Sequence, residues 1–248
     1  MNAEQSIGED IERLVLADRK VGHTGPWRIQ IGDSELQFRS VVVDDPILTG
    51  AQILAAAGLR DRTEYLVYQM LASGLLEEIN PEETTDIRAG RVARFVVFKS
   101  DRSFRFLVDD RAMDWGASHI SGATLRALSG RKEPGLVVWQ DLRGQADLLV
   151  LDDDLVDLAA PGVERFNLRE CAFDIFVNGT PETVHTPRLS YWEVVKLGFP
   201  DAKAQDNMVY TIDYSAGPHQ NTEGALGEGE SVRVKNGMKF YVTPSDKS

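Results

Sequence analysis

The sequence predicts an α+β protein of three tandem modules, each a mixed β-sheet wrapped over a single helix. The main observation is an order of elements that occurs three times along the 248 residues: hairpin, helix, strand, polar loop and closing strand. The closing strands each carry a phenylalanine at the equivalent position, Phe95, Phe166 and Phe240, which gives a repeat of about 70–75 residues. One larger α/β fold is the alternative interpretation.

Each module opens with an alternating apolar strand, a two-residue turn and a second short strand. The three segments are WRIQIGDSELQF from Trp27, FRFLVDDRAMDW from Phe104 and FDIFVNGTPETV from Phe173. Their predicted turns are Gly32-Asp33, Asp109-Asp110 and Asn178-Gly179. Alternation with period two is typical of half-buried strands, and Asn-Gly is a strong hairpin signal.

A helix follows each hairpin. A hydroxyl side chain stands where the N-cap belongs, because it can accept a bond from a first-turn N–H; these residues are Thr49, Ser121 and Ser190. Apolar residues then recur at helical spacing, and a glycine provides the C-terminal stop at Gly58, Gly130 and Gly198.

The remaining strands complete the order of a β-grasp fold. The third strands are YLVYQM from Tyr65, GLVVWQ from Gly135 and YTIDYS from Tyr210, and the closing strands are RVARFVVF, GVERFNL and GMKFYVT. In this fold the first and last strands lie parallel in the middle of the sheet, so their inward residues should be the most buried. We expect three separate cores, containing Ile29/Ile53/Phe95, Phe106/Leu125/Phe166 and Ile175/Val194/Phe240.

These patterns predict five segments: an N-terminal arm (1–26, partly helical), three domains (27–100, 101–169 and 170–243) and a flexible tail (244–248). In the arm, Ile7, Ile11, Leu14 and Val15 share one helical face, which either packs on the first module or binds a partner. The joins at 99–102 and 169–172 are short and should leave the modules little freedom.

Composition favours protein partners in the cytoplasm. The formal charge is -12, from 39 acidic and 27 basic residues, and such a surface repels the phosphates of nucleic acids. No apolar run approaches the roughly 20 residues that span a bilayer, and the start MNAEQSIGED lacks the features of a signal peptide. A single cysteine excludes an internal disulfide and a multi-cysteine metal cluster. We therefore expect neither nucleic-acid nor membrane binding.

Several residues could suggest chemistry, but each has a simpler interpretation. The run Asp152-Asp153-Asp154 lacks the glycine and terminal glutamate of an EF-hand and is interpreted as a solvated turn. The four histidines (His23, His119, His185 and His219) have no metal-ligand spacing, and Cys171 has no histidine near it in sequence. GALGEGES from Gly224 is interpreted as a flexible loop and not a phosphate loop. We expect no catalytic residues, metal or cofactor, and hence no enzyme.

Over residues 27–248 the chain resembles the bacterial multi-ubiquitin-domain proteins. The third module carries the most specific match: FDIFVNGTP, LSYWEVVKL, YTIDYSAGP and GMKFYVT. The second module's DDDLVDL followed by PGVERF is also similar to this family, whereas the first module is divergent and has RAGRVARF in place of PGVERF.

The resemblance implies a ubiquitin-like modifier of a bacterial ubiquitination-like conjugation pathway, with a role in antiphage defence. The implied partners are an activating enzyme, a conjugating-enzyme-like protein and a peptidase of the same operon, together with target proteins. Attachment would use the C-terminus of the third domain, where we expect a mobile processing and conjugation tail beyond the closing strand: Thr243, Pro244, Ser245, Asp246, Lys247 and Ser248.

The expected tail differs from that of ubiquitin-type modifiers, which end in Gly-Gly. Either a peptidase trims the chain, or a different terminal residue is activated, or the protein is not conjugated. The last case leads to an alternative function, a non-covalent tandem β-grasp scaffold that binds protein partners through its exposed sheet faces, with avidity from the tandem array.

Overall fold

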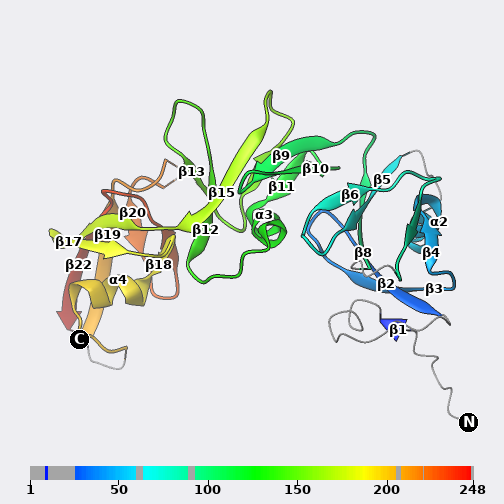
Figure 1. The fold of residues 1–248 in the computed structure, drawn as a ribbon. Helices are drawn as coiled ribbons and strands as arrows, with labels where there is room; N and C mark the ends of the chain where they lie inside the picture. The colour runs from blue at the N-terminus through cyan, green and yellow to red at the C-terminus, as the bar shows by residue number, and fades with distance from the viewer. Residues whose placement is uncertain are drawn as a thin grey trace, which may run out of the picture. The chain divides into compact units, whose positions relative to one another are not determined.

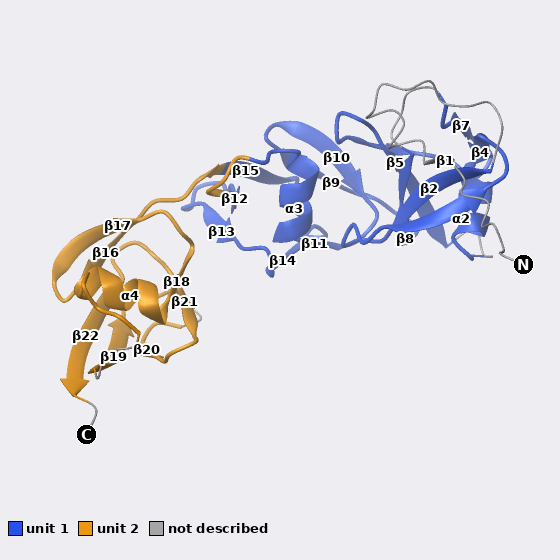
Figure 2. Cartoon of the chain, turned by 90° about the horizontal axis from the view of Figure 1, so that it is seen from below, with its two compact units in different colours: residues 1–132, 138–168 blue, residues 133–137, 169–248 orange. Residues whose placement is uncertain are grey.

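The computed structural model describes residues 9–10, 26–59, 64–88, 93–204, 208–219 and 221–246. Three mixed sheets follow one another along this part of the chain, each with one short helix (Figure 1). The chain divides into two compact units. Residues 1–132 and 138–168 form the first, and residues 133–137 and 169–248 form the second (Figure 2). We call the segments β2–β8, β9–β15 and β16–β22 the first, second and third modules.

The sheet of the first module has the strand order β1-β2-β8-β5-β6, with β3 beside β2. Its strands are β1 (Glu9–Asp10), β2 (Trp27–Gly32), β3 (Arg39–Val43), β5 (Tyr65–Met70), β6 (Leu76–Glu78) and β8 (Arg94–Lys99). A separate two-stranded sheet joins β4 (Ile47–Thr49) to β7 (Thr84–Asp86), and helix α2 spans Gly50–Ala56.

The second module repeats this plan with the order β10-β9-β15-β12-β13. Its strands are β9 (Phe104–Val108), β10 (Arg111–Trp115), β12 (Leu136–Gln140), β13 (Leu148–Val150) and β15 (Glu164–Glu170). The short strands β11 (His119–Ser121) and β14 (Leu155–Asp157) pair separately, and helix α3 spans Gly122–Ser129.

The third module has the equivalent order β17-β16-β22-β19-β20. Its strands are β16 (Phe173–Val177), β17 (Thr180–Val184), β19 (Met208–Ser215), β20 (Gly224–Leu226) and β22 (Lys239–Asp246). Strands β18 (Arg188–Ser190) and β21 (Ser231–Arg233) form the separate pair, and helix α4 spans Tyr191–Gly198. Three copies of one topology confirm the predicted tandem β-grasp architecture.

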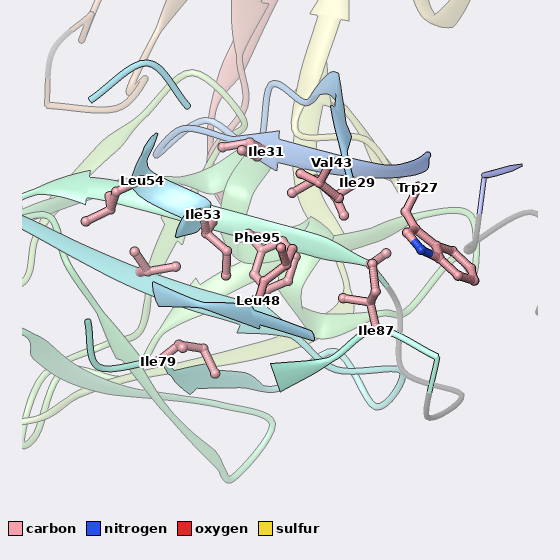
Figure 3. Packing of buried hydrophobic residues seen from close by; sticks show 12 residues of the cluster. Trp27, Ile29, Ile31, Val43, Leu48, Ile53, Leu54, Ile79, Ile87 and Phe95 are labelled. Atoms are coloured by element: carbon pink, nitrogen blue, oxygen red, sulfur yellow. The ribbon is translucent and has the colours of Figure 1, made fainter. Parts of the chain in front are cut away.

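The predicted central pair of parallel strands is present in every module, as β2–β8, β9–β15 and β16–β22. Figure 3 shows the core of the first module, where Ile29, Ile53 and Phe95 belong to one buried cluster as predicted. In the second module the rings of Phe106 and Phe166 are 6.1 Å apart, and both are buried.

The third core also has the predicted members. Ile175, Val194 and Phe240 are fully buried, and helix α4, which carries Val194, contacts both β16 and β22. Because the helix supplies one apolar face and the sheet another, each small module closes a core of its own.

The predicted helix caps are confirmed. The side chains of Thr49, Ser121 and Ser190 each accept a bond from the backbone N–H three residues later. Gly58 and Gly130 adopt the left-handed conformation expected of a stop, with φ of 84° and 71°. The third stop was wrong, because Gly198 is the last helical residue and Phe199 is the C-cap.

The predicted two-residue turn of the first hairpin was wrong. Strand β2 ends at Gly32 and β3 begins only at Arg39. Asp33 organises the intervening loop, because its carboxylate accepts the N–H groups of Glu35 and Gln37. The other two turns are confirmed as Asp109-Asp110 and Asn178-Gly179, whose positive φ angles suit tight hairpins.

Two further expectations concern chain segments outside the cores. The stretch GALGEGES from Gly224 was predicted to be a flexible loop; its first three residues instead form strand β20 (Gly224–Leu226), which pairs with β19, and a turn follows before β21 begins at Ser231. Of the N-terminal arm, the described residues Glu9–Asp10 form β1, parallel to β2. The proposed helical face at Ile7, Ile11, Leu14 and Val15 lies outside the described residues.

Candidate functional site

The last strand of the third module, β22, contains most of the predicted tail. It pairs antiparallel with β19 over eight positions, from Ser215 opposite Lys239 to Met208 opposite Asp246. The expectation that the chain leaves the sheet at Thr243 is therefore corrected. Thr243, Pro244, Ser245 and Asp246 are residues of the closing strand, because β19 begins early enough to pair with all of them. Lys247 and Ser248 lie outside the described residues.

The side chains of β22 change character along the strand. Phe240 and Val242 alternate with exposed neighbours and are buried, whereas the side chains from Thr243 to Asp246 are all exposed. The hydroxyl of Ser245 donates to the carbonyl oxygen of Val209, at 3.3 Å. The last four residues of β22, Thr243 to Asp246, are thus held by backbone pairing with β19 and contribute no side chain to the core.

On the edge that faces β16, the strand pairing of β22 ends earlier. The parallel pairing with β16 ends at Val177 opposite Phe240. Beyond it the side chain of Asn178 contacts Val242 twice. Its Oδ1 accepts the Val242 N–H at 2.8 Å, and its Nδ2 donates to the Val242 carbonyl at 3.2 Å. The Asn-Gly motif indicated only a turn, so this second role of Asn178 was missed by sequence reasoning.

The outer face of the third sheet, opposite α4, carries exposed apolar side chains. Phe176 on β16 is 38% exposed and Tyr241 on β22 is 51% exposed. Phe176 lies between Pro181 on β17 and Lys239 on β22, and Tyr241 lies opposite Asp213. Diagonal neighbours on adjacent strands are within reach of aromatic side chains, so Phe176 and Tyr241 form one apolar strip.

The equivalent face of the first module is covered. Val96 follows the core residue Phe95 as Tyr241 follows Phe240, yet Val96 is fully buried. Phe98, on the same face, packs edge-on between Tyr68 and Trp115 of the second module. Burial raises the pKa of the Tyr68 hydroxyl far above its usual value, aided by the nearby Glu78 carboxylate.

Polar contacts also join the first two modules. Arg111 donates to the carbonyl oxygen of Ser73 at 3.1 Å, and the Ser121 hydroxyl donates to the Glu35 carboxylate at 2.8 Å. The first two modules therefore form one packed unit, in line with the little freedom expected from the short join at 99–102, whereas the residues that make the contact were not predicted.

Cys171, His185 and the acidic turn at 152–154, which could have suggested a catalytic or metal site, have structural partners. Cys171 is buried, which raises the pKa of its thiol above its ordinary value, and its carbonyl oxygen lies 3.2 Å from Nδ1 of His185. In the acidic turn, Asp152 pairs with Arg126 at 2.7 Å, and Asp154 accepts the Leu151 N–H. Within the described ranges, no group of three or more acidic, histidine or cysteine side chains is arranged to hold a metal ion.

None of the helices in the described part of the chain has the length and apolar character needed to span a bilayer.

A family model described as Multiubiquitin matches residues 35–100, 104–170 and 173–246, one segment for each module. No curated protein matches the chain.

Proposed function

The chain belongs to the multiubiquitin family, and on this premise we propose that it is a ubiquitin-like protein modifier attached to targets through the C-terminal end of its third module. The observation that supports this proposal is the last part of β22. From Thr243 to Asp246 every side chain is exposed and the backbone is paired on one side only, so this segment can be withdrawn without opening the core.

The chemistry of the proposal requires a free carboxylate on an extended thread. An activating enzyme would join that carboxylate to AMP from ATP, releasing pyrophosphate, and transfer to a nucleophile on the carrier or target would then release AMP. A peptidase would first trim the chain if the natural end is not the activated one. The proposed partners are therefore an activating enzyme, a conjugating-enzyme-like protein, a peptidase and target proteins, in the cytoplasm. The chain itself would supply no catalytic group.

The test combines the full chain with a peptidase and an activating enzyme of the kind proposed as its partners and with ATP, followed by intact-mass measurement. We expect loss of C-terminal residues, or an ATP-dependent adduct at the C-terminus, or both. A reaction without ATP separates trimming from activation. An unchanged mass with active enzymes would contradict the modifier proposal.

A second candidate function is a non-covalent scaffold, and the apolar strip of Phe176 and Tyr241 favours it. Aromatic side chains on an otherwise polar surface are typical anchors of protein interfaces. Two variants distinguish the functions. Deleting residues 243–248 should abolish adduct formation and leave scaffold binding to the conjugating-enzyme-like protein intact, whereas Tyr241→Ser should weaken that binding and leave activation unaffected.

A further inference from the structure

Val242 is the last residue of β22 whose backbone groups are hydrogen-bonded on the edge that faces β16. Met238 and Phe240 direct their carbonyl oxygens towards β16, where they accept the N–H groups of Phe176 and Asn178, each at 2.9 Å. Backbone groups of a strand alternate between its two edges, so Val242 faces the same way, and the amide of Asn178 takes the place of a neighbouring strand. We call this pair of bonds the Asn178 clasp.

The next residue in this phase is Pro244, which has no N–H to offer on that edge. Proline is tolerated in a strand where the missing donor would face away from the paired neighbour. Among the described residues, β22 pairs only with β19 beyond Phe240. The structure of the strand therefore changes between Val242 and Thr243. Up to Val242 the strand is bonded along both edges and alternate side chains are buried. From Thr243 to Asp246 it is paired only with β19, and every side chain is exposed.

The second module has the same arrangement built from different residues. Asp109 occupies the turn position of Asn178, and its carboxylate accepts the N–H of Leu168 at 2.9 Å. A carboxylate cannot donate, and the carbonyl oxygen of Leu168 is instead bonded by Arg131 at 2.8 Å. Two different side-chain solutions at equivalent places indicate that the fold benefits from closing this edge.

We propose that the Asn178 clasp sets the limit to which the closing strand can be peeled. Thr243 to Asp246 separates from β19 as a thread while the module stays folded, and Val242 and all earlier residues remain in place. An enzyme that takes its substrate as an extended strand thus reaches the peptide bonds that follow Val242 and not those before it. The use of this thread by a peptidase or an activating enzyme rests on the proposed function, whereas the clasp itself does not.

Hydrogen exchange of the full chain, followed by NMR at single amides, tests the clasp directly. In the natural chain we expect the amide of Val242 to exchange at least about tenfold more slowly than those of Thr243 and Ser245, because local opening exposes only the latter. In Asn178→Gly, Val242 should exchange at nearly the rate of Thr243, with Phe240 unchanged. Glycine is the proper replacement because Asn178 has φ of 50°.

Asp109→Gly is the matched control, since it removes the equivalent side chain from the second module and should leave Val242 unaffected. Asn178→Asp retains the acceptor for the Val242 N–H, so the Val242 amide should still exchange slowly in this variant. If Asn178→Gly does not fold, the exchange rates of Val242 in Asn178→Asp and in the natural chain test the proposal. Equal rates at Val242 and Thr243 in the natural chain, or an unchanged Val242 rate in a folded Asn178→Gly, would overturn the proposal. None of these measurements depends on conjugation.

Proteolysis provides an independent readout. Proteinase K at low concentration, followed by intact-mass measurement, should remove residues only from Thr243 onward in the natural chain. In Asn178→Gly the earliest cut should move upstream of Val242. Cuts within 239–242 of the natural chain would show that the clasp sets no limit.

Discussion

The ring of Phe98, in the closing strand of the first module, packs edge-on against Trp115 of the second module, with ring centroids 4.6 Å apart and planes at 67°. Both side chains are buried. The next residue, Gly116, also lies against the Phe98 ring: a Cβ added to it would be 2.5 Å from Cγ of Phe98. This contact covers the sheet face whose counterpart in the third module is open.

Gly116→Ala should therefore destabilise the unit formed by the first two modules. The added methyl group would meet the buried ring of Phe98, which already packs against Tyr68 and Trp115, and overpacking of this kind costs about 1–3 kcal/mol. Denaturant unfolding followed by tryptophan fluorescence measures the loss. Gly227→Ala is the control, because its nearest neighbour at 3.1 Å is the flexible carboxylate of Glu230. Equal stability of the two variants would contradict this account of the contact.

Phe240→Ala should unfold chiefly the third module. Phe240 is fully buried on the central strand, and truncating a large core side chain costs about 3–5 kcal/mol. Tyr241→Ala, one residue further on the same strand but half-exposed, should cost far less. Hydrogen exchange resolved by module provides the measurement. Loss of protection in the first two modules along with the third would argue against separate cores.

The order of elements could be predicted because it depends on local patterns. Alternating strands and hydroxyl N-caps depend on residues only a few positions apart, so they can be recognised in the sequence. The phenylalanines Phe95, Phe166 and Phe240 then show that the pattern repeats. The short paired strands, such as β4 with β7, were missed since three residues carry too little periodicity to indicate a strand.

The parts that could not be predicted depend on contacts distant in sequence. Burial of Phe98 depends on Trp115 of another module, and nothing in the strand RFVVFK says which of its faces is covered. The end of the closing strand depends on how early β19 begins at Met208. Exposed polar residues such as those from Thr243 onward have the composition of a loose tail, and only their pairing partner shows otherwise.

Cys171 should be unreactive in the folded protein. Burial raises the pKa of its thiol, so the thiolate that attacks alkylating reagents is depleted. Labelling with iodoacetamide at pH 8.5 should be at least about tenfold slower in native protein than in guanidinium chloride, since the unfolded thiol has a pKa of about 8.5. Equal rates would show that the thiol is accessible.

The same shift makes stability depend on pH in the alkaline range. The folded state keeps the proton of Cys171 to a higher pH than the unfolded state does, so the contribution is complete below the ordinary thiol pKa and is lost as pH rises from there through the raised value. Cys171→Ala should reduce this alkaline loss of unfolding free energy. A variant with the same pH dependence as the natural chain would rule out this residue as its source.

The N-caps Ser121 and Ser190 provide a final, paired prediction. Ser190 caps α4 with its partner Glu193 in an exposed capping box, and Ser190→Ala should cost about 1 kcal/mol. Ser121 caps α3 but is also buried, and its hydroxyl lies 2.8 Å from the Glu35 carboxylate of the first module. Ser121→Ala should therefore cost about 0.5–1 kcal/mol more than Ser190→Ala, since it removes a second hydrogen bond.

A double-mutant cycle isolates that second bond. Ser121→Ala made in a Glu35→Ala background should lose the extra cost, which leaves a coupling energy of about 0.5–1 kcal/mol between the two residues. Unfolding free energies of the four chains give the value. A coupling indistinguishable from zero would mean that the cap acts within its own module alone. A measurable coupling would show that the same hydroxyl which starts the helix of the second module also holds the first module against it.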